Sequence, residues 1–163
     1  MRVSAVLITQ DAERTLDRVL GSLNWVDEIV IVDSGSTDAT EEIARRHDAK
    51  FLVRDWPGFG PQKRRAAAEA RGEWILSVDA DEEVSPELAR SIREAVADPG
   101  DRVGFKMYRY TAFLGTWLGS RGWWREWKLR LYRRDRGEFN DEWVHEGVSV
   151  DGPVGELSGP LYH

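Results

Sequence analysis

The chain has 163 residues, of which 41% are hydrophobic and eight are tryptophan, and this suits one compact domain with a substantial core. Its net charge of -6 argues against a general nucleic-acid-binding protein, because such a protein needs a broad surface that neutralises phosphate. The absence of cysteine excludes a disulfide scaffold, thiolate metal sites and cysteine nucleophiles.

The N-terminal stretch "MRVSAVLITQ" contains an apolar run that is too short for a signal peptide or a membrane span. We interpret it as the first β-strand. We therefore expect a cytoplasmic protein, and peripheral contact with the inner face of the cytoplasmic membrane stays open.

The first hundred residues alternate between strand-like and helix-like patterns. Apolar runs without alternation predict buried strands, and apolar residues at helical spacing predict helices. The expected strands cover residues 3–8, 28–32, 50–53 and 74–78, and the expected helices cover residues 13–23, a segment ending near 47, 60–71 and 86–97. Thr37 or Asp38 is the expected N-cap of the second helix, and Ser85 with Pro86 begins the fourth. This order predicts an α/β fold with a mostly parallel, Rossmann-like sheet flanked by helices.

The pattern changes after residue 100. Residues 104–110 and 128–133 look like strands, and a loop rich in glycine and tryptophan separates them. The last twenty residues suggest short strands and turns. We therefore expect a mixed sheet that closes with antiparallel strands.

The segment "SVDADEEV" places a cluster of carboxylates directly after the strand at 74–78. Asp79 and Asp81 lie one residue apart in an extended segment, so both can face one cation and its phosphate ligands. Oxygen ligands of this kind suit Mg²⁺ or Mn²⁺. The alternative is a solvated turn, but ligands of parallel sheets bind beyond the carboxyl ends of strands, and this segment lies there.

A second polar loop, "DSGSTD", follows the strand at 28–32. Gly35 allows close approach of the backbone to a ligand, and Asp33 can accept hydrogen bonds from a ribose or a base. An ordinary turn with a helix cap would explain the same residues without a ligand.

Basic residues gather in two places. Lys63 at the start of a helix can meet phosphate, although a solvated helical face is the alternative. Residues 121–136 mix cations with aromatic residues, which can stack on sugar rings or bind phosphorylated saccharides and anionic lipid headgroups. Trp123, Trp124 and Arg130 are the candidates there.

The motifs "SAVLIT", "DEIVIVDSGSTDAT" and "GEWILSVDADEEVSPEL", in this order and spacing, resemble family 2 glycosyltransferases of the GT-A fold. The segments "WVDEIVIVDSGSTD", "GFGPQK" and "VHEGV" are similar to the branch that adds sugars to the lipopolysaccharide core, the β-glucosyltransferase type. The resemblance covers essentially the whole chain.

The resemblance implies that a nucleotide-diphosphate sugar binds the N-terminal sheet and that a divalent metal on the Asp-x-Asp motif neutralises the departing diphosphate. Thr9 and Asp33 would touch the nucleoside, Asp79 the ribose or the metal, and Asp81 the metal. A late histidine often supplies a further metal ligand in such enzymes, and His163 is the candidate.

The resemblance also implies an inverting mechanism, in which a carboxylate deprotonates the acceptor hydroxyl. Asp141, Glu142 and Glu146 all lie in the right segment, and the family pattern selects Glu146. His145 would position the acceptor or only pack.

Three departures from the family pattern leave the base and the sugar undetermined. Asp11 stands where asparagine is usual, Ser34 replaces a frequent acid, and "QKR" replaces "QKN" at 62–64. Family members are also longer, so the resemblance implies a further C-terminal helical part beyond His163.

We therefore expect one domain over 1–163, with a nucleotide-sugar half at 1–100 and an acceptor half at 101–163. The expected activity is metal-dependent, inverting transfer from a nucleotide-diphosphate sugar, UDP-linked, to a saccharide such as the lipopolysaccharide inner core or another lipid-linked saccharide. Two alternatives remain: a non-catalytic carbohydrate- or lipid-binding module on the same fold, and a nucleotidyltransferase, which is disfavoured because "TQDAERTL" has no glycine-rich phosphate loop.

Overall fold

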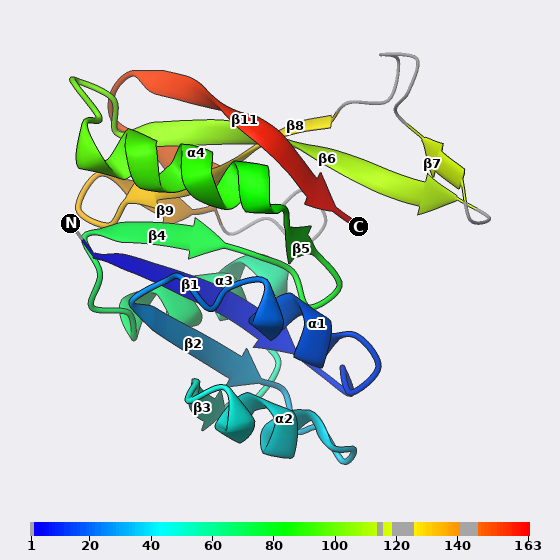
Figure 1. Ribbon diagram of the computed structural model, residues 1–163. Coiled ribbons are helices and arrows are strands. Elements are labelled where there is room, and N and C mark those ends of the chain that lie inside the picture. The colour runs from blue at the N-terminus through cyan, green and yellow to red at the C-terminus, as the bar shows by residue number, and fades with distance from the viewer. Residues whose placement is uncertain (1, 114–115, 119–125, 141–146) are drawn as a thin grey trace.

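The computed structural model describes residues 2–113, 116–118, 126–140 and 147–163. In this part of the chain, a mixed nine-stranded sheet has helices on both faces (Figure 1). The strand order is β3-β2-β1-β4-β8-β6-β11-β5, and β7 lies off this path and pairs with β6. The strands of this sheet are β1 Val3–Thr9, β2 Glu28–Asp33, β3 Lys50–Val53, β4 Trp74–Ser77, β5 Glu83–Val84, β6 Gly104–Phe113, β7 Thr116–Leu118, β8 Glu126–Arg133 and β11 Val154–Tyr162.

Two further strands, β9 Gly137–Phe139 and β10 Val148–Val150, form a separate antiparallel pair. The helices are α1 Leu16–Gly21, α2 Thr40–Arg46, α3 Phe59–Ala68 and α4 Pro86–Ala97. The predicted α/β class and the mostly parallel mixed sheet are confirmed.

The directions of the strands determine which edge of the sheet can bind a ligand. Strands β1 to β4 run parallel to one another, whereas β8 is antiparallel to both β4 and β6. Because β11 is parallel to β6, it points the same way as β1 and β4. The carboxyl ends of β1, β4 and β11 therefore meet at one edge, the place where open α/β sheets bind ligands.

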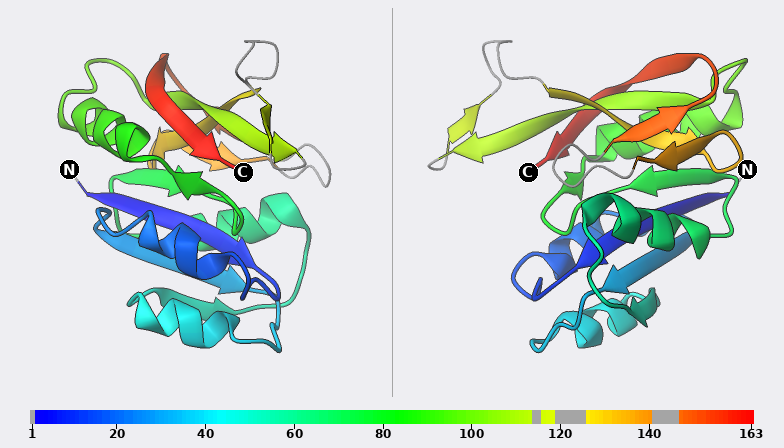
Figure 2. Two further views of the ribbon diagram at one scale, coloured as in Figure 1. Left: turned by 45° about the vertical axis from the view of Figure 1, so that its right-hand side comes forward. Right: turned by 180° about the vertical axis from the view of Figure 1, so that it is seen from behind.

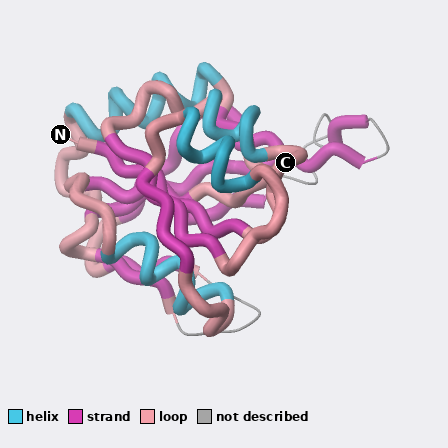
Figure 3. Tube along the Cα trace, turned by 90° about the horizontal axis from the view of Figure 1, so that it is seen from below, coloured by secondary structure: helices cyan, strands magenta, loops and turns pink. Residues whose placement is uncertain are grey.

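Each face of the sheet has its own core. Strand β4 shows the division, because Leu76 packs with α1, α2 and α4 on one face while Ile75 packs with α3 on the other. The two views in Figure 2 show α4 and α3 on these opposite faces, and Figure 3 shows the strands between the helices. Side chains alternate along a strand, so an unbroken apolar run supplies both cores.

The helix starts differ from the sequence expectation. Helix α1 begins at Leu16 rather than at residue 13, because Asp11 takes a left-handed conformation (φ 48°) and the chain turns before the helix. Helix α2 has Ala39 as its N-cap instead of Thr37 or Asp38. Asp38 still accepts a hydrogen bond from the Thr40 amide (3.0 Å), but it precedes the N-cap residue and Thr40 is the first residue of the helix. Ser85 caps α4 as expected and accepts a hydrogen bond from the Leu88 amide (3.1 Å).

The expectation for the last twenty residues was wrong in one respect. Instead of only short strands and turns, the segment contains β11, a nine-residue strand between β6 and β5. Gly159 and Pro160 concealed it, because both residues are unfavourable inside regular strands. The structure accommodates them at an irregularity, where the pairing of β11 with β6 shifts register between Glu156 and Pro160.

None of the helices in the described part of the chain is long and apolar enough to cross a membrane.

Candidate active site

A cavity of about 520 Å³ opens at the carboxyl edge of the sheet. The segments that follow β1 and β4, the first turn of α3 and the chain end after β11 surround it. Its lining residues are Ile8, Gln10, Asp11, Ala12, Arg14, Thr15, Phe59, Lys63, Asp79, Ala80, Asp81 and His163. The structure thus brings together four residues that the sequence marked as candidates: Lys63, Asp79, Asp81 and His163.

Asp79 lies between two cations on the floor of this cavity. The Lys63 ammonium is 2.7 Å from Asp79 Oδ1, and the Arg130 guanidinium donates to Asp79 Oδ2 at 2.8 Å. Lys63 and Arg130 are both buried. Lys63 therefore does not lie on a solvated helical face. The Arg130 guanidinium contacts Asp79, the carboxylate that the resemblance assigns to the ribose or the metal.

The ion pairs control the charge of Asp79. Burial by itself raises the pKa of a carboxylate, but the charges of Arg130 and Lys63 lower the pKa of Asp79 by more. Its net pKa lies well below the ordinary value, so Asp79 stays ionised at neutral pH.

Asp81 and His163 meet at the opening of the cavity. Asp81 Oδ2 lies 3.1 Å from His163 Nε2, and both side chains are partly exposed to the cavity. The contact joins residues far apart in sequence, because β11 ends beside the loop that follows β4. The backbone holds this end in place, since the His163 amide donates to the Tyr110 carbonyl at 2.8 Å.

The donor atoms of this pair fit a divalent cation. A carboxylate oxygen and an imidazole nitrogen both bind Mn²⁺, and Mg²⁺ needs few protein ligands when phosphates supply the others. Asp79 differs, because both of its oxygens already accept hydrogen bonds from cations. In the described residues no group of three or more histidine or carboxylate side chains gathers as a ready metal site. A metal ligand role for Asp79, Asp81 or His163 stays a prediction.

Thr9 and Asp33 lie next to each other at the ends of β1 and β2. The Thr9 hydroxyl donates to Asp33 Oδ2 at 2.7 Å, and both residues are almost fully buried. The amides of Gly35 and Ser36 donate to Asp33 Oδ1 at 2.8 and 2.7 Å. Asp33 thus organises its own loop, and its contact with a nucleoside remains a prediction.

Sequence reasoning missed the role of Glu82 in this site. Glu82 has no exposed surface, and its Oε1 accepts a hydrogen bond from Arg130 (3.0 Å) while Oε2 accepts one from the Asp79 amide (2.9 Å). Burial raises the pKa of Glu82, and the charge of Asp79 adds to the rise, while Arg130 opposes it. The sequence shows Glu82 as one acid in a cluster, and only the pairing of β4 with β8 reveals its partner.

An exposed aromatic pair lies at the approach to α3, and its member Phe59 lines the cavity. The rings of Trp56 and Phe59 are edge to face with centroids 4.8 Å apart, and 42% and 47% of the two residues are exposed. Phe59 and Lys63 are four residues apart in α3, so both face the cavity. The segment "GFGPQK" pointed only to the family resemblance, and no sequence pattern showed that the rings of Trp56 and Phe59 are exposed.

Four predicted site residues lie outside the described part of the chain. They are Trp123, Trp124, His145 and the expected base Glu146, and the alternative acids Asp141 and Glu142 lie outside it as well.

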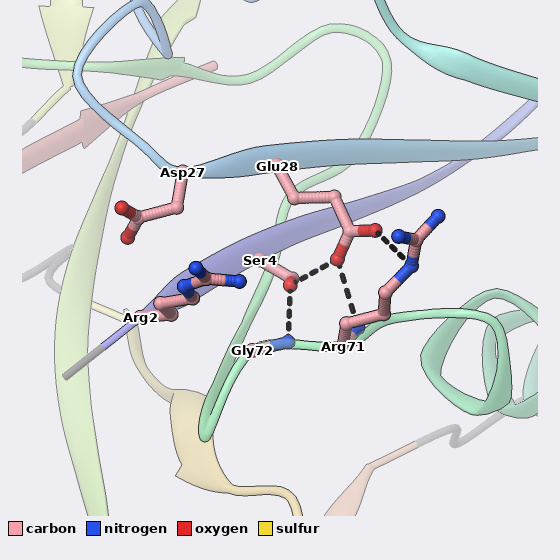
Figure 4. A pocket seen from close by; sticks show the side chains of 6 residues that line it. All are labelled: Arg2, Ser4, Asp27, Glu28, Arg71 and Gly72. Carbon is pink, nitrogen blue, oxygen red and sulfur yellow. Dashed lines mark hydrogen bonds and ion pairs between the residues drawn. The ribbon is translucent and has the colours of Figure 1, made fainter.

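Another polar cluster lies at the opposite, amino-terminal end of the strands (Figure 4). The Ser4 hydroxyl donates to Glu28 and accepts from the Gly72 amide at 2.8 Å. Glu28 also accepts from the Arg71 amide at 2.8 Å. These side chains satisfy one another, and the cluster joins β1, β2 and the turn before β4.

The sequence matches the family described as Glycosyl transferase family 2 over residues 4–148. It is 33% identical to "Lipopolysaccharide core biosynthesis glycosyltransferase LpsC" of Rhizobium meliloti, over 99% of this chain and 62% of LpsC. It is also 42% identical to an uncharacterized glycosyltransferase of Rickettsia felis, over 56% of this chain and 32% of that protein. The chain thus spans less than two thirds of the length of these relatives.

Solved structures support the fold. A structure of S. aureus TarS 1-349 in complex with UDP-GlcNAc superposes with a TM-score of 0.68 at 18% identity, covering all of this chain and 58% of TarS 1-349. Glucosyl-3-phosphoglycerate synthase from Mycobacterium tuberculosis, in complex with Mn²⁺, UDP and glucosyl-3-phosphoglycerate, superposes with a TM-score of 0.63 at 20% identity, covering 82% of this chain and 57% of the synthase chain. The resemblance inferred from the motifs is confirmed: the chain belongs to glycosyl transferase family 2 and has the GT-A fold.

Proposed function

We propose that this chain carries the donor site of a metal-dependent, inverting glycosyltransferase. The donor is a nucleotide-diphosphate sugar, UDP-linked, and the acceptor is a saccharide of the lipopolysaccharide inner core. The observation that carries the proposal is the meeting of Asp81 with His163 beside the Lys63–Asp79 pair, in one cavity at the ligand edge of the sheet.

The named relatives support the choice of substrates. The similarity to LpsC, described as a lipopolysaccharide core glycosyltransferase, favours a core saccharide as acceptor. The solved complexes of the structural neighbours contain UDP or UDP-GlcNAc, and one contains Mn²⁺. A lipid-linked acceptor would place the protein at the inner face of the cytoplasmic membrane.

Different residues of the cavity would bind different parts of the donor. Asp81 and His163 would hold the divalent cation, which when bound would neutralise charge on the diphosphate. Lys63 offers a buried ammonium at the cavity, where it can contact a phosphate oxygen. Phe59 offers an exposed ring on which a planar or apolar face of the donor can lie.

Glu146 is the proposed catalytic base. It would accept the proton of the acceptor hydroxyl as that oxygen forms its bond to the anomeric carbon and the nucleoside diphosphate leaves with the electrons of the old bond. One displacement of this kind inverts the anomeric configuration and needs no covalent enzyme intermediate.

A donor-hydrolysis assay separates this enzyme from a non-catalytic carbohydrate- or lipid-binding module. We expect slow release of UDP from a UDP-sugar, lost in Glu146→Gln while UDP binding persists, and retained in the control Glu142→Gln. Saccharide or lipid binding with neither UDP binding nor donor consumption would favour the module. Release of pyrophosphate from a nucleoside triphosphate would favour the nucleotidyltransferase.

A further inference from the structure

A row of alternating charges runs from the candidate donor cavity to Arg109 in β6 and Glu126 at the start of β8. It begins with Lys63 and Asp79 and continues through Arg130 to Glu82, as described for the site. Beyond Glu82, Arg109 lies 3.5 Å from Glu82 Oε1 and donates to Glu126 Oε2 at 2.7 Å. We call these residues the charge row: Lys63, Asp79, Arg130, Glu82, Arg109 and Glu126.

Glu82 is the most completely buried member of the row. It has no exposed surface, whereas the Glu126 side chain at the end of the row is half exposed. A buried carboxylate is tolerated only when cations and hydrogen bonds compensate it, and replacing such groups by apolar residues is often stabilising. Burial of Glu82 therefore calls for an explanation other than stability.

The contacts of Glu82 point to its role. Its Oε2 accepts from the Asp79 amide (2.9 Å), and its own amide donates to the Asp79 carbonyl (3.0 Å), so the turn from 79 to 82 is closed at both ends. Its Oε1 shares one Arg130 nitrogen with Asp79 Oδ2, at 3.0 and 2.8 Å. Glu82 thus fixes both the backbone and the counter-charge of Asp79.

The 79–82 turn also orients the Asp81 side chain. With Glu82 held inward by Arg130 and Arg109, the intervening residues face outward, and Asp81 reaches His163 at the cavity opening. The Thr15 hydroxyl holds the turn from the other side by donating to the Ala80 carbonyl at 2.7 Å.

We propose that Glu82 is a positioning residue, which holds Arg130 and the 79–82 turn so that Asp79 and Asp81 face the donor diphosphate. This inference rests on the proposed function, because it assigns Glu82 a task within that donor site. It assigns no contact between Glu82 and the substrate.

Glu82→Gln tests the proposal, because it keeps the shape of the side chain and removes the charge that holds Arg130. The matched control is Glu83→Gln, since Glu83 is the next residue and its side chain forms an ion pair with Arg18 (3.4 Å). UDP affinity is measured by calorimetry with and without Mn²⁺, on protein shown to be folded by circular dichroism.

We expect the Mn²⁺-dependent affinity of Glu82→Gln for UDP to fall by about 10-fold to 100-fold, the range seen when a residue that orients metal ligands is lost. Affinity without Mn²⁺ should change much less, and Glu83→Gln should match the wild type. A folded Glu82→Gln protein with lower thermal stability and unchanged UDP affinity in Mn²⁺ would overturn the proposal, because a purely structural role predicts that result.

Glu82→Asp covers the case in which Glu82→Gln does not fold. It keeps the charge that balances Arg130 and Arg109 but is too short to reach both Arg130 and the Asp79 amide. We expect a smaller loss of Mn²⁺-dependent affinity, and a wild-type affinity would overturn the proposal. Failure of the wild type to bind any nucleoside diphosphate would instead contradict the proposed function itself.

Discussion

Lys63 illustrates how structural contacts can hold a residue at the proposed donor site. Its ammonium is buried, lies 2.7 Å from Asp79 and stands 6.0 Å from the centre of the Phe139 ring. Sequence patterns could place Lys63 at the start of a helix near the ligand edge. They could not show its burial, because burial depends on β8 and β9 packing against α3.

Lys63→Met should weaken both folding and donor binding. We expect the free energy of unfolding to fall, by less than the roughly 3–5 kcal/mol typical of a broken buried pair, because Asp79 keeps Arg130. UDP affinity should fall as well, since the cation at the cavity is lost. Urea unfolding and calorimetry measure the two effects.

Lys50→Met is the matched control, because Lys50 makes a more exposed ion pair with Glu69 at the same 2.7 Å distance. Its unfolding free energy should change by at most about 1 kcal/mol, and UDP binding should not change. Equal effects of the two substitutions on UDP affinity would contradict the role given to Lys63.

At the scale of elements, β11 matters most, because it carries His163 to the donor edge. Its irregular part packs against the start of α4. Gly159 has a φ of +94°, and a Cβ there would overlap the Leu88 amide nitrogen and lie 2.8 Å from Leu88 Cα. Only glycine fits at this crossing without moving α4.

Gly159→Ala should therefore destabilise the protein strongly. Backbone strain and overpacking each cost about 1–3 kcal/mol, which for a chain of this size lowers the melting temperature by several degrees. Thermal unfolding followed by circular dichroism measures the change.

Gly21→Ala is a control that should raise the stability instead of lowering it. Gly21 ends α1, and a Cβ there would meet nothing within 4 Å. Alanine in a helix should stabilise by up to about 1 kcal/mol. A Gly159→Ala protein as stable as the wild type would show that β11 does not pack on α4 as described.

The elements also show where prediction from sequence works. Uniform apolar runs identified β1 to β4, and α4 began where Ser85 and Pro86 indicated. These signals are local. Strand β11 was missed because its glycine and proline are tolerated only at a register shift against β6, which no local pattern reveals.

The candidate site was likewise predictable where the sequence signal is local and not where it depends on long-range packing. The acidic segment after β4 pointed to Asp79 and Asp81, and the family resemblance added His163. Glu82, Arg109 and the exposed Phe59 emerged only from long-range packing. Asp33 binds its own loop, which the alternative of an ordinary turn also predicted, and its contact with a nucleoside stays a prediction.

For the whole molecule, the buried charges predict how stability depends on pH. The folded-state pKa of Asp79 lies below its ordinary value of 3.8, so the ionised carboxylate stabilises the fold above that pH. This contribution is lost as the pH falls below about 4 towards the folded-state pKa. Glu82 acts oppositely, because its raised pKa means that its ionisation above about pH 4.5 opposes folding.

Chemical denaturation in metal-free buffer between pH 6 and pH 3 tests whether the ionised Asp79 carboxylate stabilises the fold. We expect the free energy of unfolding of the wild type to fall more steeply below about pH 4 than that of Asp79→Asn. Asp55→Asn is the control, because Asp55 is an exposed acid paired with Arg65 (3.0 Å). Parallel pH profiles for wild type and Asp79→Asn would contradict the account of Asp79.

The most direct test of the central claim is calorimetric titration of UDP, with and without Mn²⁺, on wild type and Asp81→Ala. The proposed donor site predicts tight binding that needs Mn²⁺ in the wild type and loses that dependence in Asp81→Ala. Binding of GDP, CDP or dTDP in place of UDP would keep the mechanism and change the donor. Failure of the wild type to bind any of these nucleotides with Mn²⁺ present would contradict the transferase assignment for this chain.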